Sequence, residues 1–356
     1  MKIAVYTICL NEEQFIKRWA DSAKDADYRI LVDTGSTDNT VQIAKDAGCT
    51  VHTIKINPWR FDDARNVSLA LVPEDVDLCI CLDADEVLVE GWRAHLEALP
   101  EGVNRPRYNY TWSWNADGSP GLSYHGDKIH SRFGFRWRHP VHEVLSSSVP
   151  EVQHFCGMEI HHHADNTKSR SQYLPLLELA AREQPTCDRT AHYLAREYFF
   201  NNRTEEAIRE FKRHITMETA LWPAEKARSM RYLAQCEPHL AETWLLRAIS
   251  EDPNRRETWV DLATHYYKQN RWVPCYTAAL RGLEIESKTG DYMVENFAWG
   301  YILYDLAAIA AYRLGDRKNA LKYGLIAVQK EPQDSRLIAN LGYYQDDKLV
   351  MDEMEI

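Results

Sequence analysis

The sequence predicts an α/β domain built on a mainly parallel sheet, followed by an all-α domain of helical repeats. In the first half, short apolar runs alternate with amphipathic segments at the spacing of βαβ units. From about Ser169 onward the strand-like runs disappear, and Ala, Leu, Tyr and Trp recur every three or four residues, as in helices. The 356 residues, 45% of them hydrophobic, are enough for two domains with separate cores.

The strands and helices of the first half follow from their boundaries. Strands of a parallel sheet are buried on both faces, so they read as continuous apolar runs that end at turn residues. Strands are expected at residues 2–8, 29–32, 50–54 and 78–82. Helices are expected up to about Ala23, after the turn-rich loop 33–40, and at 61–71.

Polar side chains follow these strands at one rim of the predicted sheet. Asn11 and Glu12 follow the first strand, Asp33 the second, and Asp83 and Asp85 the last. Ligands of open α/β sheets bind beyond the carboxyl ends of the strands. Asp83 and Asp85 are two residues apart, so they are expected to leave the strand on the same side and to converge on one hard divalent cation. A solvated acidic turn is the alternative.

Four short motifs occur along this half in a fixed order. They are 7–13 (TICLNEE), 32–40 (VDTGSTDNT), 64–66 (ARN) and 82–86 (LDADE). In order and spacing they resemble the successive motifs of family-two glycosyltransferases with the GT-A fold, over roughly residues 1–165. The resemblance implies an inverting transfer of a sugar from a nucleotide diphosphate donor, expected to be a UDP-sugar, with Mn²⁺ or Mg²⁺ bound through the acidic motif.

Several residues of these motifs are candidates to bind the donor. Amides and carboxylates at strand ends can hydrogen-bond a base edge and ribose hydroxyls, and the candidates for this group are Thr7, Asn11, Glu12 and Asp33. The resemblance implies that Asp83 reaches the ribose or shares the metal, and that Asp85 ligates the cation directly. Arg65 is expected to pair with a phosphate or to brace Asp83, with an internal salt bridge as the alternative.

Residues 105–163 carry the candidates for the acceptor side. Aromatic side chains alternate along 107–114 and 132–138, where they can stack on sugar rings or simply fill the core of a small sheet. Trp137 and Arg138 are the candidates to contact the sugar or acceptor. The stretch 137–145 (WRHPVHEVL) is similar to the Val-His-Glu stretch of lipopolysaccharide-type members of the same family. A direct displacement needs a base for the acceptor proton, and Glu143 is preferred over His142 for this role.

Three consecutive histidines, 161–163, close this region. In an extended segment His161 and His163 share one face and His162 lies on the other. Because GT-A enzymes often add one late histidine to the acidic pair, His163 is chosen as a metal ligand, with His161 as the alternative. A zinc site is less favoured, since neither a nearby cysteine nor a spaced fourth ligand is present.

In the second half, small residues recur at the spacing expected for a repeat of about 34 residues. This half resembles tetratricopeptide repeats at 188–221, 225–255, 256–289 and 299–334, although the turn of the second, around Cys236, is shorter than the pattern requires. An ordinary all-α domain is the alternative. The expected domains are therefore 1–165 and 166–345, followed by an acidic tail at 346–356.

Composition narrows the class of function. The formal net charge of -11 argues against broad binding of nucleic-acid backbones. The eight cysteines are scattered without paired CxxC spacing, and neither an apolar leader nor a run of eighteen apolar residues occurs. These features predict a cytoplasmic protein with reduced thiols and no membrane span.

Together these observations predict a metal-dependent glycosyltransferase whose repeats present a macromolecular acceptor, a peptide, protein or glycan with a hydroxyl or thiol. A homo-oligomer is compatible with such an array. Two alternatives stay open. The acceptor could be a hydroxylated DNA base, which requires a common basic face formed by Arg209, Lys212, Arg213, Arg228 and Arg231. The transferase domain could also be inactive and serve as an interaction scaffold.

Overall fold

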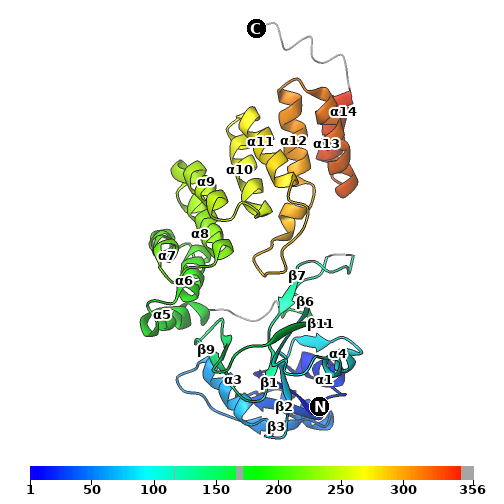
Figure 1. Ribbon diagram of the computed structural model, residues 1–356, viewed down its shortest axis with the longest axis vertical. Helices are drawn as coiled ribbons and strands as arrows, with labels where there is room; N and C mark the ends of the chain where they lie inside the picture. Colours follow the sequence, from blue (N-terminus) through cyan, green and yellow to red (C-terminus); the bar gives the residue numbers. More distant parts are fainter. Residues whose placement is uncertain (116, 166–170, 346–356) are drawn as a thin grey trace. The chain divides into compact units, whose positions relative to one another are not determined.

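A computed structural model describes residues 1–115, 117–165 and 171–345, in two compact units (Figure 1). Unit 1 comprises Met1–Glu183 and Gly290–Tyr292, and unit 2 comprises Gln184–Thr289 and Met293–Ile356. The predicted acidic tail, 346–356, lies outside the described residues.

The central sheet of unit 1 has five strands in the order β3-β2-β1-β4-β8. These are β1 (Ile3–Cys9), β2 (Tyr28–Asp33), β3 (Thr50–Thr53), β4 (Leu78–Cys81) and β8 (Ile129–Ser131). The first four run parallel and β8 is antiparallel to β4. The four strands expected from apolar runs are therefore confirmed, together with their parallel arrangement.

A second, four-stranded sheet and a hairpin complete the strands of unit 1. The second sheet has the order β5-β11-β6-β7, and β9 pairs with β10 in the hairpin. Their bounds are β5 (Glu86–Leu88), β6 (Arg105–Thr111), β7 (Ser123–Gly126), β9 (Phe135–Arg138), β10 (Val144–Ser147) and β11 (Gln153–His162). The acidic turn between β4 and β5 thus connects the two sheets, and the histidines lie at the end of β11.

Helices cover both faces of the central sheet. They are α1 (Glu13–Ser22), α2 (Thr40–Asp46), α3 (Phe61–Ala70) and α4 (Trp92–Glu97). Because side chains alternate along a strand, β1 feeds two cores. Ile3 and Val5 face a core that contains α1, α2, α4 and the second sheet, whereas Ala4 and Tyr6 face a core that contains the end of α3 and the hairpin.

Unit 1 extends past the boundary expected at residue 165. It includes α5 (Tyr173–Glu183), whose first residue meets the ring of Phe61 edge to face at 6.3 Å. At the other end of α5, Glu183 accepts a hydrogen bond from Arg60 at 2.6 Å. The strand pattern of the sequence ends before α5, but α5 still packs within unit 1. Sequence periodicity therefore places the domain boundary too early.

Unit 2 consists of antiparallel helix pairs. The pairs are α6 (Asp188–Phe200) with α7 (Thr204–Thr216), α8 (Pro223–Cys236) with α9 (Ala241–Glu251), α10 (Arg256–Lys268) with α11 (Trp272–Leu283), and α12 (Ile302–Arg313) with α13 (Arg317–Lys330). The helix α14 (Ser335–Gln345) follows the last pair. Each pair falls on one of the four predicted repeats, so the helical repeat architecture is confirmed.

Small residues lie where the two helices of a pair cross. Ala263 of α10 and Cys275 of α11 are both fully buried, as are Ala308 and Ala320 of the last pair. In the second pair, a short 3₁₀ turn at Pro238–Leu240 links α8 to α9, which accounts for the short turn seen in the sequence. None of the helices in the described part of the chain is long and apolar enough to cross a membrane.

Candidate active site

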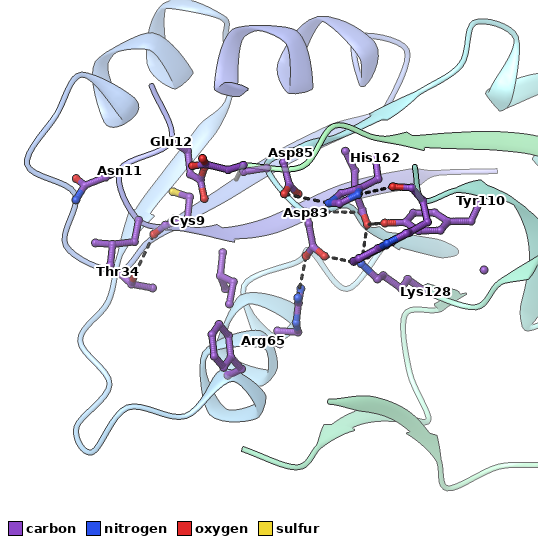
Figure 2. Close-up of a pocket in the computed structure, with 18 of the residues that line it drawn as sticks. Cys9, Asn11, Glu12, Thr34, Arg65, Asp83, Asp85, Tyr110, Lys128 and His162 are labelled. Atoms are coloured by element: carbon purple, nitrogen blue, oxygen red, sulfur yellow. Dashed lines mark hydrogen bonds and ion pairs between the residues drawn. The ribbon is translucent and has the colours of Figure 1, made fainter. Parts of the chain in front are cut away.

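A cavity of about 960 Å³ opens in unit 1 beyond the carboxyl ends of β1, β2 and β4 (Figure 2). Residues that follow each of these strands line it, and the second sheet supplies a further wall through Tyr110 and His162. Of the residues predicted to form a site, the cavity gathers Asn11, Glu12, Arg65, Asp83 and Asp85. Four of the five rim residues expected from the strand pattern therefore line one cavity, and Asp33 does not.

Asp83 is held between two cations. Arg65 approaches one of its oxygens at 2.8 Å and Lys128 the other at 2.5 Å, from two sides (Figure 2). Burial alone would raise the pKa of Asp83, but the two cations lower it well below its usual range. Asp83 is thus a permanent anion with both oxygens engaged. Two roles were predicted for Arg65, pairing with a phosphate and bracing Asp83. The structure shows Arg65 bracing Asp83.

Glu86 forms the buried base of this network. Its side chain is 1% exposed and accepts hydrogen bonds from the hydroxyl of Tyr110 at 2.6 Å and from Lys128 at 2.9 Å. Its second oxygen accepts the backbone N–H of Asp83 at 2.8 Å, which fixes the acidic turn. Burial raises the pKa of Glu86.

Asp85 points to a different partner. Its carboxylate lies 3.3 Å from Nε2 of His162, whereas Asp83 contacts Arg65 and Lys128. The expectation that the two aspartates converge from one strand face does not hold, because β4 ends at Cys81 and both residues lie beyond it. In a turn the two-residue alternation of side chains no longer applies.

The histidine beside Asp85 is His162, and not the predicted His163 or its alternative His161. The shared face of His161 and His163 is confirmed, since both rings contact Trp114, at centroid distances of 4.8 and 5.8 Å. The face that lies beside the acidic turn is the one that carries His162, and not the one chosen for the metal. The backbone N–H of His163 donates to the carbonyl oxygen of Asp85 at 2.8 Å.

The imidazole of His162 is oriented by a second contact. Its Nδ1 lies 2.9 Å from the carbonyl oxygen of Trp112, and the indole of Trp112 stacks on it at 4.3 Å. A carbonyl can only accept, so Nδ1 carries a proton, and Nε2 is left either to donate a second proton to Asp85 or to present a lone pair to a cation. Burial opposes protonation of His162, yet Asp85 and the carbonyl together raise its pKa.

The predicted base, Glu143, is engaged elsewhere. Its carboxylate forms a short ion pair with the Arg65 guanidinium, whose side chain is 9% exposed, and it does not line the cavity. His142 does not line the cavity either, and its ring meets Tyr173 edge to face at 5.4 Å. Arg65 therefore joins Glu143 to Asp83.

Two of the residues that were predicted to contact the donor, Thr7 and Asp33, serve the fold of the domain. Thr7 is fully buried in β1. Asp33 is 3% exposed and accepts the N–H groups of Gly35 and Ser36, so it shapes the loop after β2 and does not line the cavity. A carboxylate that caps its own turn is a common alternative to a ligand contact.

Of the predicted acceptor contacts, Trp137 is contradicted as a surface for sugar stacking. It is 3% exposed, and its indole donates a hydrogen bond to the hydroxyl of Tyr6 at 2.9 Å within the core. Arg138 is exposed on β9 but does not line the cavity. The rings that do line it include Trp59, Phe61 and Tyr173.

Lys128 and Tyr110 were missed at the sequence level. Lys128 lies between β7 and β8, and no motif surrounds it. Tyr110 belongs to the aromatic strand that was considered for sugar stacking, and its hydroxyl binds Glu86. The sequence carries no signal for either contact, since both depend on how the second sheet folds against the acidic turn.

Residues 4–123 match the family model described as Glycosyl transferase family 2. They include β1 to β4, the acidic turn and β6, which together form much of the cavity wall. The predicted combination of a family-two glycosyltransferase domain of GT-A type with tetratricopeptide-type repeats is confirmed.

Relatives carry each part of this combination. The chain is 33% identical over 104 residues to the lipopolysaccharide core biosynthesis glycosyltransferase LpsC of Rhizobium meliloti, which covers 28% of this chain and 37% of LpsC. It is 30% identical over 160 residues to a TPR repeat-containing protein of Synechococcus elongatus, covering 43% of this chain and 37% of that protein. The chain thus spans well under half the length of these relatives.

Solved structures show weaker likeness. PilF of Pseudomonas aeruginosa is 16% identical with a TM-score of 0.37, over 48% of this chain and 71% of that chain. Glucosyl-3-phosphoglycerate synthase of Mycobacterium tuberculosis, solved with Mn²⁺ and UDP-glucose, is 27% identical with a TM-score of 0.26, over 31% and 44%.

Proposed function

We propose that the glycosyltransferase domain transfers a sugar, with inversion, from a nucleotide diphosphate donor to a hydroxyl or thiol of an acceptor. A UDP-sugar is the proposed donor and Mn²⁺ or Mg²⁺ the proposed cofactor. The family match over residues 4–123 supports the reaction class. The cavity at the carboxyl ends of the parallel strands supports the placement of the donor.

The pairing of Asp85 with His162 carries the proposal. A carboxylate oxygen and an imidazole lone pair only 3.3 Å apart repel each other unless a proton or a cation lies between them. Carboxylate oxygen and imidazole nitrogen are suitable ligands for Mn²⁺. Within the described ranges, no group of three or more His, Cys, Asp or Glu side chains is arranged to hold a metal. Donor oxygens would therefore complete the coordination, and the metal would neutralise charge on the departing diphosphate.

The remaining roles divide along the cavity. Asn11 and Thr34 lie at one end of the labelled side chains and Lys128 at the other, with the acidic turn between them (Figure 2). We assign the first end, which includes Glu12, to the nucleoside and the acidic turn to the diphosphate. Glu143 is assigned to bracing Arg65, since an ion pair with a guanidinium occupies the carboxylate that the role of base would need.

The repeats are proposed to bind a macromolecular acceptor, because helical repeat arrays present extended surfaces. A DNA acceptor is less well supported. Lys212 is paired with Glu237 and Arg213 with Glu210, both at the surface of α7. Arg228 and Arg231 lie on another helix, α8, and both bind Glu295. The fifth basic residue, Arg209, lies 3.6 Å from Glu210. The basic residues that a DNA acceptor requires are thus neutralised by acidic partners and divided between two helices.

Slow hydrolysis of nucleotide-sugars tests the proposed reaction without an acceptor. The full chain is incubated with radiolabelled UDP-, GDP- and dTDP-sugars, each with Mn²⁺, with Mg²⁺ and with EDTA, and free sugar is quantified. We expect one class of UDP-sugar to be hydrolysed in a manner that EDTA abolishes. Hydrolysis of no donor, together with no binding of any nucleotide in calorimetry, would contradict the proposal.

A further inference from the structure

Lys128 is held at the cavity wall by its backbone. Its carbonyl accepts the N–H of Cys81, the last residue of β4, at 3.1 Å, and its own N–H lies 3.4 Å from the hydroxyl of Tyr108. Two residues earlier, a Cβ on Gly126 would lie 2.3 Å from the ring of Tyr108, so only glycine permits this approach. The position of Lys128 beside the acidic turn is therefore fixed.

The ammonium of Lys128 has capacity for one more acceptor. It donates to Asp83 at 2.5 Å and to Glu86 at 2.9 Å, and an ammonium carries three N–H groups. Lys128 lines the cavity, so its third N–H can donate into it. Asp83 and Glu86 raise the pKa of Lys128 well above its usual value despite its burial, which keeps it charged.

We propose that Lys128 binds the diphosphate of the donor directly and thereby stabilises the leaving group, which rests on the function proposed above. A charge-assisted hydrogen bond to a phosphate oxygen strengthens as negative charge grows on that oxygen during bond cleavage. Asp83 and Glu86 act as its positioning residues. This gives Asp83 a role that differs from metal ligation: it holds Arg65 on one side and Lys128 on the other.

The charge balance makes the contact dependent on the metal. Around Arg65 and Lys128 lie the carboxylates of Asp83, Glu86 and Glu143, so anions outnumber cations even before Asp85 is included. Such a site repels a diphosphate in the absence of a divalent cation. Lys128 also opposes binding of the divalent metal ion alone, because both are positively charged. Removing its charge should therefore act on the two ligands in opposite directions.

Calorimetry on the full chain separates these two effects. The variants are Lys128→Met, which removes the charge, Lys128→Arg, which keeps it, and Lys17→Met as a matched control. Lys17 also pairs with an aspartate, Asp21, but its side chain on α1 is 75% exposed and does not line the cavity. The titrants are Mn²⁺ alone, and then UDP, UMP and uridine in the presence of saturating Mn²⁺.

We expect Lys128→Met to weaken UDP binding by about 10- to 100-fold, the loss typical of a charged hydrogen bond, and to leave uridine binding unchanged. The affinity for Mn²⁺ alone should rise by about two- to tenfold. Lys128→Arg should retain most of the UDP affinity, and Lys17→Met should match the wild type. Equal losses for UDP and uridine, or unchanged UDP binding, would overturn the role of Lys128.

Two further comparisons keep the test decisive. If Lys128→Met unfolds, the double variant Lys128→Met with Glu86→Gln removes the cation and one of its counter-charges together. Because the net charge of the site is then kept, its Mn²⁺ affinity should stay close to that of the wild type while its UDP affinity falls by about 10- to 100-fold. If the wild type binds neither UDP nor any other nucleotide with Mn²⁺, the proposed function fails. A wild type that binds UDP, beside a Lys128→Met variant that binds it equally well, refutes only the inference about Lys128.

Discussion

Asp83 and Asp85 are the same residue type, two positions apart, and their surroundings give them different tasks. Arg65 and Lys128 occupy the oxygens of Asp83, so it serves as a counter-ion that positions two cations. Asp85 instead lies 3.3 Å from Nε2 of His162, an arrangement that favours a proton or a cation between them. The chemistry of an acidic motif is thus decided by what each carboxylate contacts.

Replacing Asp85 tests this division. We expect Asp85→Asn to abolish metal-dependent hydrolysis of the donor and to lower Mn²⁺ affinity by at least about 100-fold, because an anionic ligand is lost, while the melting temperature stays close to that of the wild type. Metal titration by calorimetry and a melting curve measure both. Asp25→Asn, at an exposed site, is the matched control. Wild-type hydrolysis by Asp85→Asn would remove Asp85 from the metal site.

The three histidines provide a paired experiment. His162 is the one whose imidazole reaches Asp85, whereas His161 and His163 lie against Trp114. We expect His162→Ala to weaken Mn²⁺ binding by about 10- to 100-fold and His163→Ala to change it little. The measurement is a Mn²⁺ titration of each variant in the presence of UDP. The reverse ranking would restore His163 as the ligand.

At the scale of elements, the helix pairs of unit 2 depend on small residues at their crossings. Ala263 and Cys275 are fully buried between α10 and α11, so extra side-chain volume there must push the two helices apart. Packing at native density leaves no void to absorb such a change.

We therefore expect Ala263→Leu to destabilise unit 2 by about 1 to 3 kcal/mol, the typical cost of overpacking a core. Urea unfolding of the full chain, followed through hydrogen exchange of α10 and α11, measures the loss. Ala339→Leu, at an exposed position of α14, adds the same volume without a crossing helix and should change stability by less than about 0.5 kcal/mol. Equal effects at both positions would refute the crossing role.

A buried polar cluster joins the first three helices of unit 2. Ser229 of α8 lies 2.7 Å from Nδ1 of His192 on α6 and 2.9 Å from Nδ1 of His214 on α7. Burial is the main cause that lowers the pKa of His192 well below its usual value. The positive and titratable groups that face it add to this effect: His214, Arg196, Arg228 and Arg189. His192 is therefore neutral in the folded protein at neutral pH.

This lowered pKa predicts acid sensitivity of unit 2. The unfolded chain binds a proton on His192 below about pH 6.5 and the folded chain does not, so stability falls with pH below that value by about 1.4 kcal/mol per pH unit. The urea midpoint of α6 to α8 should drop between pH 7.5 and 5.5, measured by brief deuterium labelling at one common pH. His192→Gln should reduce this drop, and the exposed His239→Gln should not. Equal drops in the wild type and His192→Gln would exclude His192 as the cause.

At the scale of the whole molecule, the continuous N-terminal part of unit 1 ends with α5, and Gly290–Tyr292 also belong to unit 1. The edge contact between Phe61 and Tyr173 and the ion pair between Arg60 and Glu183 join α5 to the start of α3. Tyr173 also lines the cavity, so α5 belongs to the candidate active site as well as to the fold of unit 1.

We expect a chain that ends at Glu183 to bind UDP and Mn²⁺ nearly as well as the full chain, and one that ends at Asp165 to melt at a lower temperature and bind UDP more weakly. The loss of apolar contacts and of the Arg60 ion pair is the reason. Melting curves and UDP titrations of the two truncations measure this. Equal stability of both would show that α5 adds nothing to unit 1.

The sequence by itself determined the four parallel strands of the central sheet, the repeats and the residues of the acidic motif. Continuous apolar runs identify buried strands, and spaced small residues identify helix crossings, because both patterns reflect local periodicity. The partners of the motif were decided only by the tertiary structure. Tyr110 and His162 come from strands far along the chain, and Lys128 comes from the segment between β7 and β8. Whether the two strand residues face the cavity or the core depends on the twist and register of the second sheet. His162 and His163 are adjacent and therefore lie on opposite faces of the strand. Local periodicity carries no information about which face meets Asp85.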